Sequence, residues 1–321
     1  MASHLVGGDA ERVTFTPTEI QGMLRAHGIA PSRALGQNFV ADPNTVRRIA
    51  RVAELAPGQP VIEIGPGLGS LTVALVEAGA RVTALELDRH LVPILRENVE
   101  PLGVTVLEGD ALTADWPAIL TGHDEWALVA NLPYNVATPL VLDLLDDVPA
   151  ITTMLVMVQR EVGERLAAGV GDKAYGIPSV KVSYWARAVL AGRVPASVFV
   201  PQPKVESVLV RITRRPAPAV AADPELLFRL VRAGFGQRRK MLRRSLHDLV
   251  TDDAFAAAGV RPEARAEELD VEAWGRLADA CAPRPPTAHG ERLDEGSPRV
   301  ARGVGDDVAE GVRDGVREGE G

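Results

Sequence analysis

The sequence has very little cysteine and no long apolar run. Its single cysteine, Cys281, excludes an intramolecular disulfide, and without clustered histidines or a second cysteine we expect no metal site. No apolar stretch approaches the roughly 20 residues that a membrane-spanning helix needs. Met1 to Arg12 lack the basic and apolar segments of a secretion signal. These absences predict a protein that works in the reducing cytoplasm and away from membranes.

The chain also lacks an excess of positive charge. Its formal net charge is −8, which excludes a uniformly basic nucleic-acid binder but leaves room for a local basic patch. Apolar content, by contrast, is ample. Of the 321 residues 46% are hydrophobic, enough for the core of one large or two ordinary domains. From about Pro283 large apolar side chains almost disappear, which predicts a disordered tail.

Residues Pro60 to Ile64 form a short apolar stretch that runs into a glycine-rich turn and then into apolar residues at helical spacing. Strand, glycine turn and helix together predict the opening of a nucleotide-binding βαβ unit, in which Gly65 and Gly67 let the backbone approach a ligand closely. A second predicted strand ends in Glu86, about 20 residues beyond the first glycine, where a carboxylate binds ribose hydroxyls. Asp110 follows the third strand, and we expect it to accept from an adenine amino group.

Two classes of enzyme fit this pattern: NAD-type dehydrogenases and S-adenosylmethionine methyltransferases. The turn here reads Gly-x-Gly-x-Gly after Glu63, whereas the dehydrogenase turn reads Gly-x-Gly-x-x-Gly and receives a pyrophosphate. The fourth predicted strand ends in Asn131, and the motif that follows it also favours the methyl donor. These residues alone leave open a protein that only binds the nucleotide.

That motif is Asn131-Leu132-Pro133-Tyr134, directly after an apolar run. The Asn131 side-chain oxygen and the Leu132 carbonyl can both accept hydrogen bonds from an exocyclic amine. Pro133 restricts the backbone so that the carbonyl stays aimed, and Tyr134 offers a face on which a base can stack. We therefore predict that this loop holds a planar base for methylation. The alternative is an ordinary strand end followed by a proline turn.

Two further loops are candidates for the same site. Gln37 and Asn38 lie between two predicted helices, together with Val40, and they matter for function only if a cofactor lies nearby. Phe199 begins a proline-rich segment that also carries Lys204. We predict that Phe199 gives the target base a second stacking surface and that Lys204 contacts a phosphate. The alternative is a proline-rich connector with a buried phenylalanine.

A dense basic run follows the sheet region. We predict a helix there whose buried face carries Leu242, Leu246 and Leu249 and whose outer face carries five cations. Those cations are Arg238, Arg239, Lys240, Arg243 and Arg244. In a net-acidic protein such a concentration favours contact with RNA phosphates, although a solvated helix face has the same composition.

The motifs taken together resemble those of the KsgA-type ribosomal RNA adenine dimethyltransferases, over roughly Thr16 to Cys281. The residues that carry the resemblance are Leu35-Gly36-Gln37-Asn38-Phe39, Glu63-Ile64-Gly65-Pro66-Gly67-Leu68-Gly69, Glu86-Leu87-Asp88, Asn131-Leu132-Pro133-Tyr134-Asn135, Phe199-Val200-Pro201-Gln202-Pro203-Lys204-Val205 and Phe235-Gly236-Gln237-Arg238-Arg239-Lys240. Mild departures are Val40, where many relatives have leucine, and Met241, where a small polar residue is common.

The resemblance implies a Rossmann-like α/β sheet of the class I S-adenosylmethionine methyltransferases with a small C-terminal all-α domain. It implies dimethylation of the N6 amine of two adjacent adenines in the 3′-terminal hairpin loop of 16S rRNA, and a role in late small-subunit biogenesis. The partner would be 16S rRNA within the 30S subunit or its precursor, and we expect a monomer. The family's cofactor positions correspond to Asn38, Val40, Gly65, Glu86, Asp110 and Asn131.

Two other functions remain as alternatives. One is the 23S rRNA adenine N6-methyltransferase of the macrolide-resistance type, which shares the Gln-Asn-Phe and Asn-x-Pro-Tyr elements but differs from this chain over Phe235 to Arg244. The other is a non-catalytic ribosome assembly factor on the same fold, against which the intact Glu86, Asp110 and Asn131 argue.

The composition shift at Arg214-Arg215-Pro216-Ala217-Pro218 and the polar tail divide the chain, and the resemblance implies what each of its four parts does. They are a flexible N-terminus (1–13), an S-adenosylmethionine-dependent methyltransferase domain (14–215), a helical RNA-binding domain (222–282) and the disordered tail (283–321).

Overall fold

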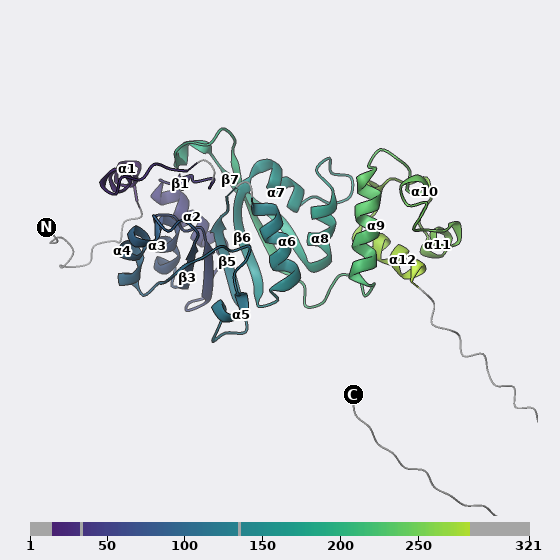
Figure 1. The fold of residues 1–321 in the computed structure, drawn as a ribbon, viewed down its shortest axis with the longest axis horizontal. Coiled ribbons are helices and arrows are strands. Elements are labelled where there is room, and N and C mark those ends of the chain that lie inside the picture. The colour runs from purple at the N-terminus through teal and green to yellow at the C-terminus, as the bar shows by residue number, and fades with distance from the viewer. Residues whose placement is uncertain (1–14, 33–34, 134–135, 283–321) are drawn as a thin grey trace, which may run out of the picture. The chain divides into compact units, whose positions relative to one another are not determined.

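The computed structural model describes residues 15–32, 35–133 and 136–282 (Figure 1). The strands are β1 (Phe39–Val40), β2 (Pro60–Ile64), β3 (Arg81–Glu86), β4 (Thr105–Glu108), β5 (Trp126–Asn131), β6 (Ile151–Gln159), β7 (Ala186–Val194), β8 (Phe199–Val200) and β9 (Ser207–Arg214). The α-helices are α1 (Pro17–Ala26), α2 (Pro43–Ala53), α3 (Ser70–Glu77), α4 (Val92–Val99), α5 (Trp116–Ile119), α6 (Ala137–Asp147), α7 (Arg160–Leu166), α8 (Ile177–Trp185), α9 (Pro224–Gly236), α10 (Leu242–Ser245), α11 (Asp252–Ala258) and α12 (Val271–Cys281).

Within the described residues one mixed sheet carries the fold, with strand order β4-β3-β2-β5-β6-β9-β7. The strands from β4 to β6 in this order run parallel, and β9 runs antiparallel to both β6 and β7. The chain leaves the first half of the sheet at β4 and re-enters beside β2 as β5, so the strand order switches between β2 and β5. Open α/β sheets bind ligands at the carboxyl ends of their strands near such a switch. The predicted α/β fold is confirmed.

Helices cover both faces of the sheet (Figure 1). Neighbouring strand residues alternate between two cores, because successive side chains of a strand point to opposite faces. Val61 and Val129 pack with α2, α3 and α4. Ile62 and Leu128 pack with α6, α7 and α8. Burial on both faces explains why β5 begins as a continuous apolar run and why β2 is apolar except for Glu63.

The described chain after β9 is helical. Helices α9 and α12 pack together around Trp274, and the same core includes Val180 and Tyr184 of α8. The division into domains at residues 215 and 222 stays a prediction. No helix of the described residues combines the length and the apolar character needed to cross a membrane. The predicted N-terminus (1–13) and tail (283–321) lie outside the described residues.

The predicted basic helix is wrong. Helix α9 ends at Gly236, the backbone N–H of Lys240 donates to the Gln237 carbonyl at 2.8 Å in a turn, and α10 spans one turn only. The backbone N–H groups of Leu242 and Arg243 donate to the carbonyls of Ala264 at 2.7 Å and Pro262 at 2.9 Å. In a longer helix these two N–H groups would instead donate to carbonyls one turn earlier in the same helix. Leu242 and Leu246 are nevertheless buried, as the spacing predicted.

Candidate active site

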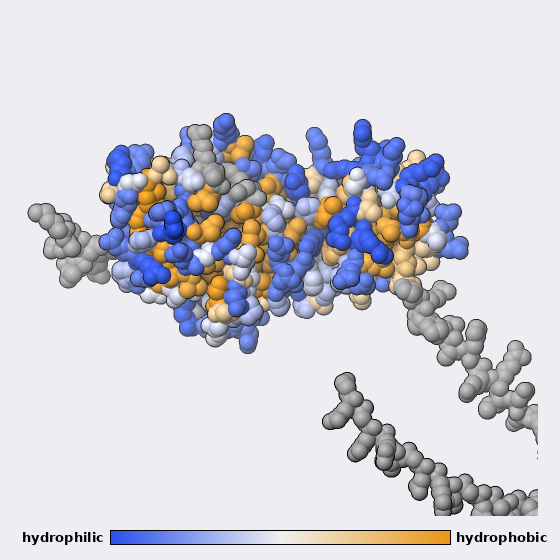
Figure 2. Space-filling view, in the orientation of Figure 1, coloured by the Kyte–Doolittle hydropathy of each residue, from blue (hydrophilic) through white to orange (hydrophobic). Residues whose placement is uncertain are grey.

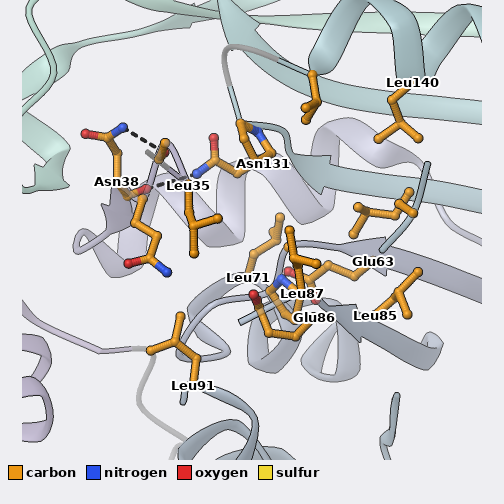
Figure 3. Close-up of a pocket in the computed structure, with 18 of the residues that line it drawn as sticks. Leu35, Asn38, Glu63, Leu71, Leu85, Glu86, Leu87, Leu91, Asn131 and Leu140 are labelled. Carbon is orange, nitrogen blue, oxygen red and sulfur yellow. Dashed lines mark hydrogen bonds between the residues drawn. The ribbon is translucent and has the colours of Figure 1, made fainter. Parts of the chain in front are cut away.

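Four strand ends meet at one edge of the sheet, because β4, β3, β2 and β5 are neighbours. Gly65 follows β2, Glu86 ends β3, Asp110 follows β4 and Asn131 ends β5. All four line a single pocket (Figure 3). Of the predicted site residues, those that line the pocket are Gln37, Asn38, Val40, Gly65, Glu86, Asp110, Asn131 and Pro133. The four strand ends were predicted separately from the sequence, and the structure brings them together.

Glu86 points into this pocket from a buried position, with 6% of its surface exposed. One carboxyl oxygen accepts from the backbone N–H of Gly67 and the other from the backbone N–H of Asp88, both at 2.9 Å. Burial raises the pKa of Glu86 above its usual range, and the two backbone donors oppose that rise. Each oxygen keeps acceptor capacity for a ligand hydroxyl, so the geometry suits the two hydroxyls of a ribose.

Gly67 supports the pocket without lining it. Its φ is +61°, and a Cβ at this position would lie 2.9 Å from the ring of Phe39. Glycine is therefore required both by the backbone conformation and by the close approach of Phe39. Its N–H orients Glu86, and its missing side chain lets Phe39 pack. The predicted contact of Gly67 with the cofactor stays a prediction.

Glu63 and Ser70 bring polar atoms into the floor of the pocket. Glu63 is 1% exposed, and among the described residues no hydrogen-bond partner reaches its Oε2 or the Oγ of Ser70. Burial raises the pKa of Glu63 to about 8, and the neighbouring Glu86 carboxyl adds to the rise. Buried polar atoms normally have partners, so unpartnered atoms at a pocket wall indicate a bound ligand or water. A ligand with a positive charge beside this carboxyl would stabilise its ionised form, which burial alone disfavours.

Asn131 lies on the opposite side of the pocket from Glu86 (Figure 3). Its Nδ2 donates to the backbone carbonyl of Asn38 at 3.0 Å. Because a carbonyl only accepts, this contact assigns the amide nitrogen, and no donor among the described residues reaches the Asn131 Oδ1. Pro133 also lines the pocket, and its carbonyl accepts from the first backbone N–H groups of α6.

Only the backbone of Leu132 could contact a target base. Its side chain is buried in the core, and its N–H donates to the Met157 carbonyl at 3.0 Å. No donor among the described residues reaches the Leu132 carbonyl. Leu132 does not line the pocket, and its carbonyl follows Asn131 in the chain as a further acceptor. Tyr134, the predicted stacking residue, lies outside the described residues.

The Gln37 side chain is already engaged at both ends. Its Nε2 donates to Asp88 Oδ2 at 2.7 Å, and its Oε1 accepts from the backbone N–H of Ser32 at 2.7 Å. The next residue, Asn38, closes a turn by donating from Nδ2 to the Gly36 carbonyl at 3.0 Å. Gln37 thus borders the pocket as a bridge between two segments.

Phe199 does not offer a stacking face, and that prediction is wrong. It is 3% exposed and packs in the same core as Val40, its partner in the antiparallel pair of β1 and β8. The alternative interpretation, a buried phenylalanine in a proline-rich connector, is correct. The short β1-β8 pair brings the Gln37–Asn38 segment against this connector. Lys204 is exposed, and its phosphate contact stays a prediction.

The sequence analysis missed two apolar residues at the pocket rim. Leu87 is 51% exposed and Leu112 is 44% exposed, and both line the pocket. Leu87 directly follows β3 and Leu112 lies four residues after β4. A leucine close behind a strand end that carries a candidate polar residue was the signal that the sequence offered. The two leucines give the pocket apolar surfaces against which a planar ring could pack.

The five cations of the basic run divide into two groups. Arg238 Nε contacts Glu267 at 2.6 Å and Arg243 Nη1 contacts Glu263 at 3.5 Å. The other three, Arg239, Lys240 and Arg244, have no ion-pair partner among the described residues. Figure 2 shows hydrophilic side chains over α10 and α11, the end of the structure that carries this run. The three unpaired cations remain candidates for phosphate contact.

The chain is similar to known proteins over most of its length. The family described as ribosomal RNA adenine dimethylase matches residues 31–282. A protein of Kineococcus radiotolerans named ribosomal RNA small subunit methyltransferase A is 47% identical over 277 residues, which cover 84% of this chain and 91% of that protein. A protein of the same name from Streptomyces coelicolor is 46% identical over 272 residues, covering 82% and 95%.

Two solved structures share the fold. A dimethyladenosine transferase from Plasmodium falciparum has a TM-score of 0.65 at 24% identity, covering 74% of this chain and 95% of that one. The 23S rRNA methyltransferase ErmE has a TM-score of 0.61 at 28% identity, covering 76% and 99%. Both likenesses agree with the observed sheet and its flanking helices.

Proposed function

The chain belongs to the ribosomal RNA adenine dimethylase family, and on this basis we propose that it dimethylates the N6 amines of two adjacent adenines in the 3′-terminal hairpin loop of 16S rRNA. It is an S-adenosylmethionine-dependent rRNA adenine dimethyltransferase. We propose further that it acts in the cytoplasm, as a monomer, on the 30S subunit or its precursor, late in small-subunit biogenesis.

One observation carries the proposal for the reacting end of the site. The Asn131 side chain lines the pocket at the end of β5, and its Nδ2 is bound to the Asn38 carbonyl, so its Oδ1 is the end available to accept. The Leu132 carbonyl, one residue on, is the second acceptor that we propose. An exocyclic amine has two N–H donors, which two adjacent acceptors can bind.

The pocket residues fit the methyl donor. Glu86 would bind the ribose hydroxyls and Asp110 the adenine amino group, whereas Leu87 and Leu112 would pack against the adenine ring. The unpartnered Glu63 Oε2 supports a bound polar ligand, because a buried polar atom without a partner is costly. A positive charge on that ligand would stabilise the carboxylate that burial disfavours. S-adenosylmethionine supplies a methyl group that its sulfonium already activates.

The protein therefore has to orient the amine and leave its lone pair free. That lone pair is delocalised into the adenine ring, and two acceptors at Asn131 and Leu132 favour a more tetrahedral nitrogen whose lone pair is available. Asn131 and Leu132 would hold the amine with its lone pair turned toward the donor's methyl group, and the proton that the amine loses would pass to water. Most of the rate should come from orientation and electrostatic placement.

The target base has to leave its stack before it can reach this loop. Tyr134 remains our proposed stacking face for it, and Lys204 a proposed phosphate contact. Arg239, Lys240 and Arg244 are the cations we propose for further RNA contact, because acidic partners do not occupy them within the described chain.

Incubation with labelled methyl donor tests the proposal. Purified small subunits whose RNA lacks the modification are compared with large subunits, and the labelled nucleosides are then identified. We expect label in N6,N6-dimethyladenosine of the small subunit only. Label in large-subunit RNA would instead assign the chain to the 23S type, and no label in either would leave only an assembly role.

A further inference from the structure

Two hydrogen bonds link the ribose side of the pocket to the target-amine side. At one end the Nε2 of Gln37 donates to Asp88 Oδ2 at 2.7 Å. At the other end the Nδ2 of Asn131 donates to the carbonyl of Asn38 at 3.0 Å. Gln37 and Asn38 are consecutive residues, so a single peptide unit joins the two contacts. Asp88 is thereby connected to Asn131 across the pocket.

Both members of the Gln37–Asp88 pair are held in place by further contacts. Asp88 Oδ1 accepts from the backbone N–H of His90 at 2.9 Å, and the Asp88 N–H donates to Glu86 at 2.9 Å. Gln37 exchanges two hydrogen bonds with Ser32, one from each backbone N–H, at 2.7 and 3.1 Å. Neither side chain is free to rotate away without losing more than one hydrogen bond.

The direction of the Asn131 Oδ1 depends on where the Asn38 carbonyl stands. On the C-terminal side of this carbonyl, Phe39 is fixed by its pairing with Val200 in the β1-β8 ladder. On the N-terminal side, the Gln37 side chain is hydrogen-bonded to Asp88, a residue that lies far along the chain from Gln37. If that contact breaks, the peptide can turn and the Asn131 amide follows it.

We propose that Gln37 and Asp88 are a positioning pair that aims the Asn131 amide at the target amine. This rests on the proposed function, because it assumes that Asn131 binds the adenine N6. Neither residue touches the reacting atoms. The pair acts by orienting the Asn131 acceptor. Breaking the pair should therefore lower the rate of methyl transfer and leave the affinity for the methyl donor nearly unchanged.

The donor and the acceptor of the Gln37–Asp88 hydrogen bond can be exchanged by mutation. In the double variant Gln37→Glu/Asp88→Asn, the amide at position 88 donates and the carboxylate at position 37 accepts. The second oxygen at position 37 still accepts from Ser32, and the amide oxygen at position 88 still accepts from His90. All the side-chain hydrogen bonds are therefore kept. Gln37→Glu alone places two carboxylates in contact and breaks the link.

The test is single-turnover methylation of undermethylated small subunits at saturating donor and RNA. We expect Gln37→Glu to slow the step by about 10- to 100-fold, since a misplacement near 1 Å costs about that much. The dissociation constant for S-adenosylmethionine should change by less than about threefold, and the double variant should recover the unmutated rate. Gln21→Glu, at an exposed glutamine of α1, is the matched control for added charge.

Two results would overturn the positioning role: a Gln37→Glu rate equal to that of the unmutated chain, or a parallel loss of donor affinity and rate that the double variant does not restore. A separate readout needs no activity. The Asn131 side-chain amide signal in an NMR spectrum of asparagine-labelled protein should shift in Gln37→Glu and return in the double variant. An unshifted signal contradicts the inference. Absence of methylation by the unmutated chain contradicts the proposed function instead.

Discussion

The side-chain Nδ2 of Asn131 donates a 3.0 Å hydrogen bond to the carbonyl of Asn38, a residue 93 positions earlier in the chain. This contact ties the loop after β5 to the segment before β1. It also decides which end of the Asn131 amide remains available, because the carbonyl takes the nitrogen and leaves the oxygen. The acceptor that we propose for the target amine is thus oriented before any RNA binds.

Glu86→Gln should weaken binding of the methyl donor. An amide has one acceptor oxygen where the carboxylate has two, so it cannot serve both the Gly67 and Asp88 N–H groups and the ribose as well. A lost hydrogen bond to a charged group is worth about 1.5–3 kcal/mol, so calorimetry should show a dissociation constant raised by about tenfold or more. Glu108→Gln, at the exposed end of β4, is the matched control. An unchanged dissociation constant in Glu86→Gln would contradict the proposal that Glu86 binds the ribose hydroxyls.

Glu63 should make the donor-free protein less stable as the pH rises. Its pKa is about 8 in the folded chain against an ordinary 4.5, so between these values the folded state keeps a proton that the unfolded state has lost. Stability conferred by that proton is complete below pH 4.5 and is lost as the pH rises toward 8.

Thermal unfolding of Glu63→Gln therefore checks the burial of this carboxyl. The variant should melt at least about 2 °C above the unmutated chain at pH 8.5, and the gap should close toward pH 5. Glu97→Gln, at an exposed carboxyl of α4, should show no such dependence. A gap that is constant with pH would mean that Glu63 does not titrate as its burial requires.

The four strand ends could be predicted from the sequence, because each follows a short stretch of strand-forming residues and carries a glycine or a polar side chain. Gly65, Glu86, Asp110 and Asn131 all occupy the expected edge. The burial of Phe199 could not be predicted from the sequence. Its burial depends on the pairing of β1 with β8, two strands of two residues each that lie far apart in the chain and carry no local signal.

The basic run shows a different limit of sequence reasoning. Leu242 and Leu246 have helical spacing and are buried, yet the helix they indicated is a single turn. The backbone N–H groups at its start bond to a loop twenty residues further along the chain, a partner that the local pattern does not reveal. The same folding brings Glu263 and Glu267 against two of the five cations.

Because of these ion pairs, we expect the three unpaired cations to contribute more to RNA binding than Arg238 and Arg243. The triple variant Arg239→Gln/Lys240→Gln/Arg244→Gln should flatten the slope of log affinity against log salt by roughly 2 to 3 units, because each neutralised phosphate releases counterions. The double variant Arg238→Gln/Arg243→Gln should flatten it by less, since Glu267 and Glu263 already neutralise those side chains.

Filter binding of small subunits at several potassium concentrations measures both slopes, with donor affinity as the control for folding. If the triple variant keeps the slope of the unmutated chain, these side chains are only a solvated surface and the basic run lies outside the RNA interface.

The most direct test of the account is the rate at which Asn131→Ala produces N6,N6-dimethyladenosine in the 3′-terminal hairpin of 16S rRNA. It is measured in a single turnover at saturating donor and small subunits, with Asn44→Ala, at an exposed asparagine of α2, as the control. By analogy with deletion of an oxyanion-hole donor, loss of this acceptor costs about 2.7–4 kcal/mol of barrier, so we expect a rate lower by about 100-fold or more. The control should match the unmutated chain. A near-unmutated rate for Asn131→Ala would contradict the claim that this amide holds the target amine.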